Sequence, residues 1–109
     1  MGEQIIINQY TKGIIVHAKR ERGLFFNERN WIILIQSVQI TPTETEVMRW
    51  VSHCMETGET FIDTRPQKWG KTTNYNFYKA TEEEKQLIKN VLKKHNLRYA
   101  KILNKLIPR

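Results

Sequence analysis

The longest dense apolar run of this chain is Trp31-Ile32-Ile33-Leu34-Ile35-Gln36-Ser37-Val38-Gln39-Ile40. Isoleucine and valine supply most of this apolar run, and their β-branched side chains pack well on a pleated surface. A nearly continuous apolar run is typical of a strand buried on both faces. The run is far shorter than the roughly 20 residues that a membrane-spanning helix needs. The sequence therefore predicts a long central strand that shorter strands and helices cover.

Two short β-branched runs precede the central strand. Residues 5–7 and 13–16 flank a polar link that contains Tyr10 and Lys12, and this pattern predicts a β-hairpin. Residues 24–26, Leu-Phe-Phe, form another apolar run before a polar turn. The first 40 residues are thus expected to form an antiparallel meander of three or four strands.

The segment after the central strand carries signals for a helix near Thr43–Thr57. Thr43 and Glu46 have the spacing of a capping box, as do Thr41 and Glu44, and Gly58 suits a left-handed helix end. Apolar residues then follow at helical spacing: Val47, Trp50, Val51 and Cys54. The alternative is a hairpin strand that turns at residues 56–59 and contains Met48, Trp50, Ser52 and Cys54. Beyond it, a short strand is expected at residues 60–63, a loop at 65–74 and a strand at 74–79.

A second helix is predicted near the C-terminus. Thr81 and Glu84 form a capping-box pattern, and acidic residues fill the first turn. Apolar residues recur at helical spacing from Ile88 to Leu106, which favours one helix over about 82–106. The alternative is an end at His95, with Asn96 in the left-handed region and a short hairpin after it. No linker or repeat interrupts the chain, so we expect one domain over residues 1–109, of the α+β class, with an antiparallel sheet and two helices.

The charge is positive and unevenly distributed. The sequence has 18 Lys and Arg against 11 Asp and Glu, a net charge of +7. Residues 41–64 carry five acids and one base, residues 65–79 carry four bases and no acid, and residues 85–109 carry eight bases and no acid. An excess of this kind attracts polyanions. The single cysteine, Cys54, excludes an internal disulfide, and the absence of a leader-like start favours a cytoplasmic protein.

No motif indicates catalysis, a cofactor or a metal. The three histidines share no metal-ligand spacing, and His95 lies on the apolar stripe, where a packed histidine is expected. Gly70-Lys71-Thr72 resembles the end of a phosphate-binding loop, but the position that requires the earlier glycine is Arg65. Cys54 has no basic neighbour and is expected to be buried and inert. We therefore expect a protein that is not an enzyme.

Two basic regions are candidates for nucleic-acid binding. Cations track phosphates and aromatic rings stack on bases, which is how single strands are held. The first region interleaves both kinds of residue: Arg65, Lys68, Trp69, Lys71, Tyr75, Tyr78 and Lys79. The competing interpretation is that Tyr75 and Phe77 face the core and that the lysines only solvate a loop. The second region is the basic face of the last helix: Lys85, Lys89, Lys93, Lys94, Arg98, Lys101 and Lys105. A basic cluster beside His17 is a further contribution: Lys19, Arg20 and Arg22.

These features predict a small basic protein that binds nucleic acid or a nucleoprotein, with RNA or single strands favoured over duplexes. An alternative hypothesis is an inhibitor or adaptor of the kind that mobile elements encode, docking on a protein such as a nucleic-acid-guided nuclease (an anti-CRISPR-like role). A small ribonuclease-type toxin that uses His17 with Lys19 or Arg20 is a third hypothesis. No membrane partner is expected.

Overall fold

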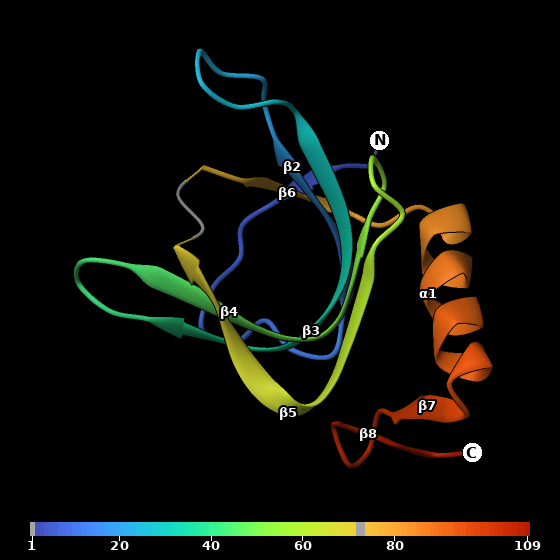
Figure 1. Cartoon of the computed structure of the whole chain (residues 1–109). Helices are drawn as coiled ribbons and strands as arrows, with labels where there is room; N and C mark the ends of the chain where they lie inside the picture. Colours follow the sequence, from blue (N-terminus) through green and yellow to red (C-terminus); the bar gives the residue numbers. More distant parts are fainter. Residues whose placement is uncertain (1, 72–73) are drawn as a thin grey trace.

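The computed structural model describes the backbone of residues 2–71 and 74–109, and the side chains of residues 2–65 and 74–109. Strands dominate this part of the chain, and one helix accompanies them (Figure 1). In chain order the elements are β1 (Gln4–Ile5), β2 (Ile15–Arg20), β3 (Arg29–Ile40), β4 (Thr45–Cys54), β5 (Thr60–Lys71), β6 (Asn76–Lys79), α1 (Glu82–Lys94), β7 (Leu97–Ala100) and β8 (Lys105–Pro108). The prediction of an α+β domain with two helices is therefore wrong, and the protein is a β-rich domain with one described helix.

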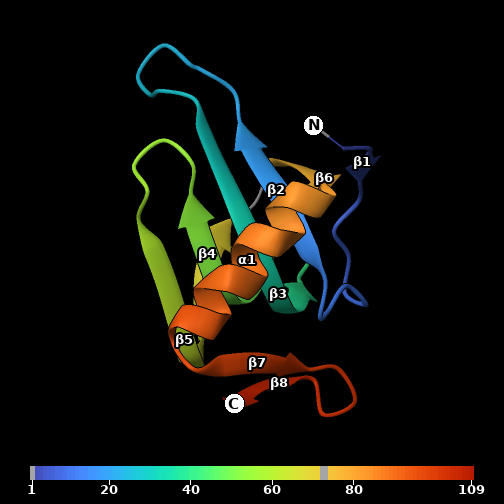
Figure 2. The same ribbon diagram turned by 90° about the vertical axis from the view of Figure 1, so that its right-hand side faces the viewer.

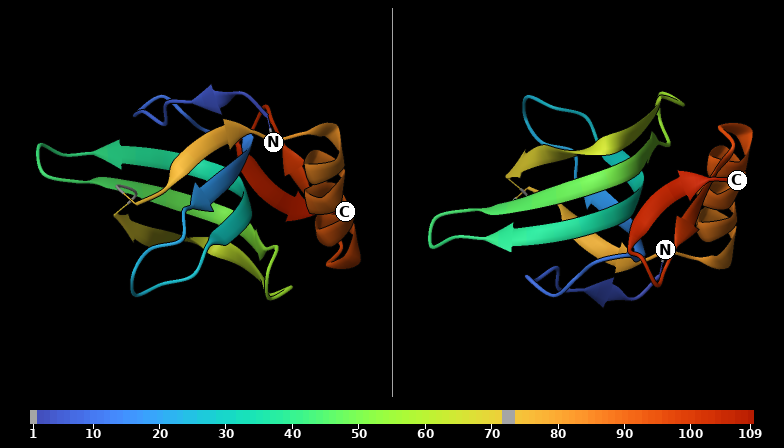
Figure 3. Two further views of the ribbon diagram at one scale, coloured as in Figure 1. Left: turned by 90° about the horizontal axis from the view of Figure 1, so that it is seen from above. Right: turned by 90° about the horizontal axis from the view of Figure 1, so that it is seen from below.

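Six strands form one curved antiparallel sheet in the order β1-β6-β2-β3-β4-β5. The predicted central strand is confirmed, because β3 lies inside the sheet and pairs with both β2 and β4. Helix α1 crosses one face of the sheet, and the β7–β8 hairpin follows at the end of the helix (Figure 2). The sheet curls around its other face, as the views from above and below show (Figure 3).

The central strand is buried on both faces, as its composition predicts. Ile33 and Ile35 belong to the core on the face that the sheet curls around. Ile32 and Leu34 belong to the core beneath α1, where they pack with Ile88 and other apolar residues of the helix and hairpin. All four β3 side chains are at most 1% exposed. Alternation along a strand sends neighbouring side chains to opposite faces, so one apolar run serves both cores.

The predicted helix at residues 43–57 is wrong, and the alternative hairpin strand is correct. β4 pairs with β3 and β5, and its register shifts between Arg49 and Val51. A β-bulge places one extra residue in a strand and so breaks the alternation of its faces. Trp50 and Val51 consequently both belong to the core beneath α1, while Val47 belongs to the opposite core. This spacing imitates a helical stripe, although the chain is extended.

The signals that predicted the ends of that helix belong to turns. The Thr41 hydroxyl accepts a hydrogen bond from the backbone N–H of Glu44 at 3.1 Å, within the β3–β4 connection. Gly58 has φ +75° and closes the β4–β5 turn, donating from its N–H to the carbonyl of Cys54 at 2.9 Å. Threonine and glycine satisfy the same backbone needs in turns as at helix ends.

The C-terminal helix is confirmed over its first part, and its continuation to Leu106 is wrong. α1 ends at Lys94 with His95 as the C-cap, and Asn96 has φ +58°. The left-handed Asn96 turns the chain back, and β7 and β8 form the short hairpin of the alternative prediction. His95 is exposed, so its assignment to the core was also wrong.

Two further local predictions fail. Residues 5–7 and 13–16 do not form a hairpin with each other, because Ile5 of β1 pairs with Phe77 of β6. The expected loop at residues 65–74 is extended up to Lys71, as the second half of β5. In both segments, pairing with another strand set the structure. β1 pairs with β6, and the second half of β5 pairs with β4.

Candidate functional site

The start of α1 is fixed by its capping box. Thr81 Oγ1 accepts from the N–H of Glu84 at 3.2 Å, and Glu84 Oε1 accepts from the N–H of Thr81 at 2.8 Å. Ile88 and Leu92 turn to the sheet and are at most 4% exposed. The apolar stripe of α1 faces the sheet, so Lys85 and Lys89 lie on another side of the helix. There they face the 12–15 segment and the β7–β8 turn.

The C-terminal hairpin is positioned by Tyr99. Its ring lies 5.7 Å from the ring of Trp50, centroid to centroid, and its hydroxyl donates to Asn104 Oδ1 at 2.7 Å. Burial raises the pKa of Tyr99 above its ordinary value, which keeps the phenol protonated as a donor. Gly13, with φ +68°, lies against the same ring, so close that an added Cβ would clash with the hydroxyl. The hairpin, the 8–14 loop and β3–β4 are thus held together at Tyr99.

A cleft of about 910 Å³ lies where the 12–15 segment, the end of β6, α1 and the β7–β8 turn meet. Five lysines from four separate segments line this lysine cleft: Lys12, Lys79, Lys85, Lys89 and Lys101. Apolar residues and one tyrosine complete much of its wall: Ile5, Ile14, Ile15, Ile102 and Tyr99. No carboxylate is among the described residues that line it. The arrangement can neutralise several anionic groups beside an apolar surface.

Two of the cleft lysines have carboxylate partners outside the cleft lining. Lys79 Nζ lies 3.1 Å from Glu3 Oε2, and Lys85 Nζ lies 3.3 Å from Glu82 Oε1. Both pairs are exposed to solvent, and pairs of this kind contribute at most about 1 kcal/mol, so a ligand phosphate can replace them. Across the described part of the chain, Lys12, Lys89 and Lys101 have no carboxylate within ion-pair distance.

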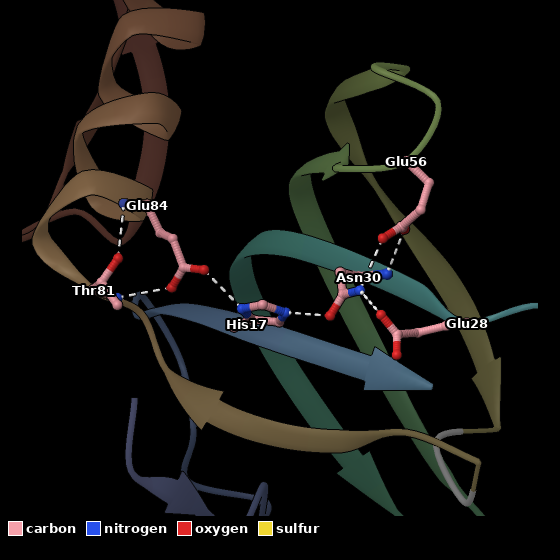
Figure 4. Close-up of polar contacts among 6 residues, drawn as sticks. All are labelled: His17, Glu28, Asn30, Glu56, Thr81 and Glu84. Carbon is pink, nitrogen blue, oxygen red and sulfur yellow. Dashed lines mark hydrogen bonds and ion pairs between the residues drawn. The ribbon is translucent and has the colours of Figure 1, made fainter. Parts of the chain in front are cut away.

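A chain of hydrogen bonds runs from the start of α1 across β2 and β3 to the β4–β5 turn (Figure 4). His17 Nδ1 lies 2.7 Å from Glu84 Oε2, and His17 Nε2 lies 2.7 Å from Asn30 Oδ1. The Asn30 amide N–H groups in turn donate to Glu28 at 2.9 Å and to Glu56 at 2.8 Å. Both ring nitrogens of His17 therefore have a side-chain partner within the fold. His17 thus links β2 to the start of α1 through Glu84 and to β3 through Asn30.

Glu56 anchors the far end of this chain. Burial acts to raise the pKa of Glu56, but hydrogen bonds from the side chain and backbone of Asn30 outweigh it and hold the pKa below its ordinary value. The positive charge of Arg29 acts in the same direction. Glu56 is thus held ionised at neutral pH as an acceptor for the N–H groups of Asn30.

Among the candidate binding residues whose side chains the structure describes, four lie in the lysine cleft: Lys79, Lys85, Lys89 and Lys101. Lys93 and Lys94 are exposed in the last turn of α1, outside the cleft. Lys12 was not among the binding residues predicted from the sequence. Lys85 and Lys89 were predicted only as part of the basic face of the last helix. The sequence signal for Lys85 and Lys89 was the absence of any acid after Glu84. For Lys12 there was none, because the fold alone brings its loop to α1.

The basic cluster on β2 has local partners of its own. Lys19 Nζ lies 3.5 Å from Glu21 and 3.7 Å from Glu28. Desolvation acts to lower the pKa of Lys19, and these carboxylates raise it above its ordinary value. The Arg20 guanidinium lies over the Phe26 ring at 4.7 Å and donates to the carbonyl of Asn27 at 3.0 Å. Arg22 is exposed in the loop beyond β2. None of these three residues lines the lysine cleft.

The region from Arg65 to Lys79 divides into a described and an undescribed part. Arg65 is exposed, and Tyr78 makes an edge contact with His17 at 6.3 Å between ring centroids. Phe77 is buried in the core, and Tyr75 packs against that core, as the competing interpretation expected. The side chains of residues 66–73 lie outside the described residues, so the binding roles of Lys68, Trp69 and Lys71 stay predictions.

The described residues contain no group of three or more His, Cys, Asp or Glu that could hold a metal ion. Cys54 is buried, in agreement with the sequence, although on a strand and not on a helix. Over the same described ranges, no helix is long and apolar enough to cross a membrane. Comparison of the chain with protein-family models, curated proteins and solved structures finds no match.

Proposed function

We propose that the protein binds single-stranded nucleic acid, RNA in particular, in the lysine cleft, without catalysing a reaction on it. One observation carries this proposal: five lysines from distant parts of the sequence converge on one cleft whose described lining is free of acids. Lysine ammonium groups neutralise phosphates as point charges and release the counterions that surround them.

The wall of the cleft supports a single strand over a duplex. Ile14, Ile15 and Tyr99 are close to the lysines, and unpaired bases need apolar or aromatic surface beside the cations that hold their phosphates. A duplex keeps its base faces stacked and offers this wall only its grooves and backbone. Net charge alone does not predict such a preference, because it acts on both kinds of nucleic acid.

Two double variants that have the same net charge as each other test the cleft. Lys89→Gln with Lys101→Gln removes two cleft lysines, and Lys93→Gln with Lys94→Gln removes the same charge from exposed positions outside it. Each is titrated against labelled single-stranded RNA and DNA at several salt concentrations. The cleft variant should flatten the slope of log affinity against log salt by about 0.7 for each lost phosphate contact.

The control should retain most of the wild-type slope and affinity. Equal losses in the two variants would show that the overall field, and not the cleft, binds the strand. Wild-type binding weaker than about 100 μM at low salt, the weak end of non-specific binding, would refute the proposal as a whole. Trp69→Ala in the same titration tests the remaining prediction for the Arg65–Lys79 region.

A second candidate function, docking on a protein target as an inhibitor or adaptor, is supported by a different surface. Leu24 and Phe25 in the β2–β3 loop are 89% and 91% exposed. Exposed pairs of large apolar residues mark interaction sites more often than chance. If Leu24→Ser with Phe25→Ser abolishes capture of a protein from the source cell after nuclease treatment, while nucleic-acid affinity is unchanged, this second function is supported.

A further inference from the structure

The turn of the β7–β8 hairpin exposes two large apolar side chains. Ile102 is 99% exposed and Leu103 is 59% exposed, and neither belongs to either hydrophobic core. Turns usually carry glycine, asparagine, aspartate or serine at such positions. The fold itself therefore gives no reason for isoleucine and leucine here.

The turn is held in a defined shape. The Tyr99 hydroxyl donates to Asn104 Oδ1 at 2.7 Å, and the Asn104 N–H donates to the carbonyl of Lys101 at 3.2 Å. Asn104 has φ +47°, a left-handed conformation that asparagine adopts more readily than most residues. Because Tyr99 also packs on Trp50, the turn is anchored to the core beneath α1. Two apolar side chains are thus presented to solvent by a supported scaffold.

The surroundings of the turn are cationic. Lys101 and Lys105 flank it in sequence, and both are exposed. Lys101 and Ile102 also line the lysine cleft, so the apolar turn adjoins the surface that attracts phosphates. The lysines therefore attract a polyanion to the turn. A ligand that also contacts Ile102 must carry apolar faces beside its anionic groups.

We propose that Ile102 and Leu103 form an apolar wedge that packs on the faces of unstacked bases while the lysine cleft holds the neighbouring phosphates. This inference rests on the proposed function and names the part of the ligand that the turn recognises. Isoleucine and leucine are among the side chains that proteins insert between base steps. Bases of a flexible single strand separate at lower cost than those of a duplex, so the wedge favours a single strand.

Substitutions at Ile102 test the wedge against a matched control. Ile102→Ser removes the apolar contact, and Ile6→Ser makes the same change at a residue that is 85% exposed and outside the cleft lining. Each protein is titrated with a labelled oligothymidylate and with an abasic strand of the same length and charge. We expect Ile102→Ser to weaken oligothymidylate binding about tenfold, the loss that corresponds to partial burial of one isoleucine.

The remaining measurements should separate bases from phosphates. Ile102→Ser should leave abasic-strand affinity and the salt slope unchanged, because an apolar contact releases no counterions. Ile6→Ser should match wild type with both strands, and Ile102→Trp should bind oligothymidylate more tightly, because a ring stacks on more of the base.

Four results would overturn the wedge. The first is wild-type protein that binds both strands equally. The second is Ile102→Ser that weakens both strands to the same extent. The third is wild-type protein that sediments with anionic phospholipid vesicles through Ile102 while showing no preference for bases, which would assign the turn to a lipid surface. The fourth is oligothymidylate binding that Ile102→Ser leaves unaltered, which refutes the wedge alone. Wild-type protein that binds neither of these strands nor single-stranded RNA refutes the proposed function.

Discussion

His17 Nδ1 lies 2.7 Å from Glu84 Oε2, and this contact joins strand β2 to the first turn of α1. The two side chains are only 12% and 14% exposed. Because Glu84 also closes the capping box with Thr81, one carboxylate both starts the helix and attaches it to the sheet. This contact adds to the packing of Ile88 and Leu92 that holds α1, and with it the wall of the lysine cleft, on the sheet.

A double-mutant cycle of His17→Ala and Glu84→Gln should reveal coupling between the two residues. We expect a coupling free energy of about 0.5–3 kcal/mol, the range for residues in one hydrogen-bonded network. Glutamine retains a capping-box acceptor, so Glu84→Gln removes mainly the charge toward His17. Urea unfolding of the four proteins measures the effect. Additive losses would show that the contact contributes nothing beyond its separate parts.

Thr81→Ala should destabilise the protein by about 1 kcal/mol, because it removes the acceptor for the N–H of Glu84. Thr81→Ser keeps the hydroxyl and should be nearly neutral. The free energy of unfolding from denaturant titration compares the two variants with wild type. If serine costs as much as alanine, the methyl group and not the hydrogen bond is responsible.

Glu56 should make the protein sensitive to acid. Its pKa is lower in the folded state than its ordinary value, so its stabilising contribution is present above that ordinary value and is lost as the pH falls through the folded pKa. Glu56→Gln should therefore lose less stability than wild type between neutral pH and strongly acidic pH. Urea unfolding across this range tests the prediction, and parallel pH profiles would contradict it.

Ile33→Asp should prevent stable folding. Ile33 is 0% exposed in the core inside the curled sheet, and an unpaired buried charge is among the few changes that cost more than about 4 kcal/mol. Ile40→Asp on the same strand is the control, because Ile40 is 44% exposed and should tolerate the charge. Circular dichroism and thermal melting of both variants decide whether β3 is buried as described.

Asn96→Ala should destabilise the protein by about 1 kcal/mol, because φ at this position is +58° and a Cβ-bearing residue without a polar side chain is strained there. Asn96→Gly should be neutral or slightly stabilising, since glycine adopts this conformation without strain. Thermal melting compares the two. An alanine variant as stable as the glycine variant would argue that α1 continues past His95 after all.

The sequence by itself determined the elements whose physical signals are local or very strong. The run at residues 32–35 had to lie in a doubly buried strand, because such a β-branched run has no other way to leave water. The capping box at Thr81 and Glu84 likewise predicted the start of α1 correctly. The positive charge after Glu84 indicated a cationic surface, although not its shape.

The tertiary structure alone decided the rest. A bulge between Arg49 and Val51 breaks the alternation of β4, so a strand acquires the apolar spacing of a helix and local reasoning fails. The apolar residues beyond Asn96 continue a helical period, yet the chain turns back there, and Tyr99 and Leu106 pack against the core beneath α1 as parts of a hairpin. Lys12 and Lys101 meet in one cleft only because the β7–β8 hairpin packs against the segment around Gly13, and no pattern along the sequence records that proximity.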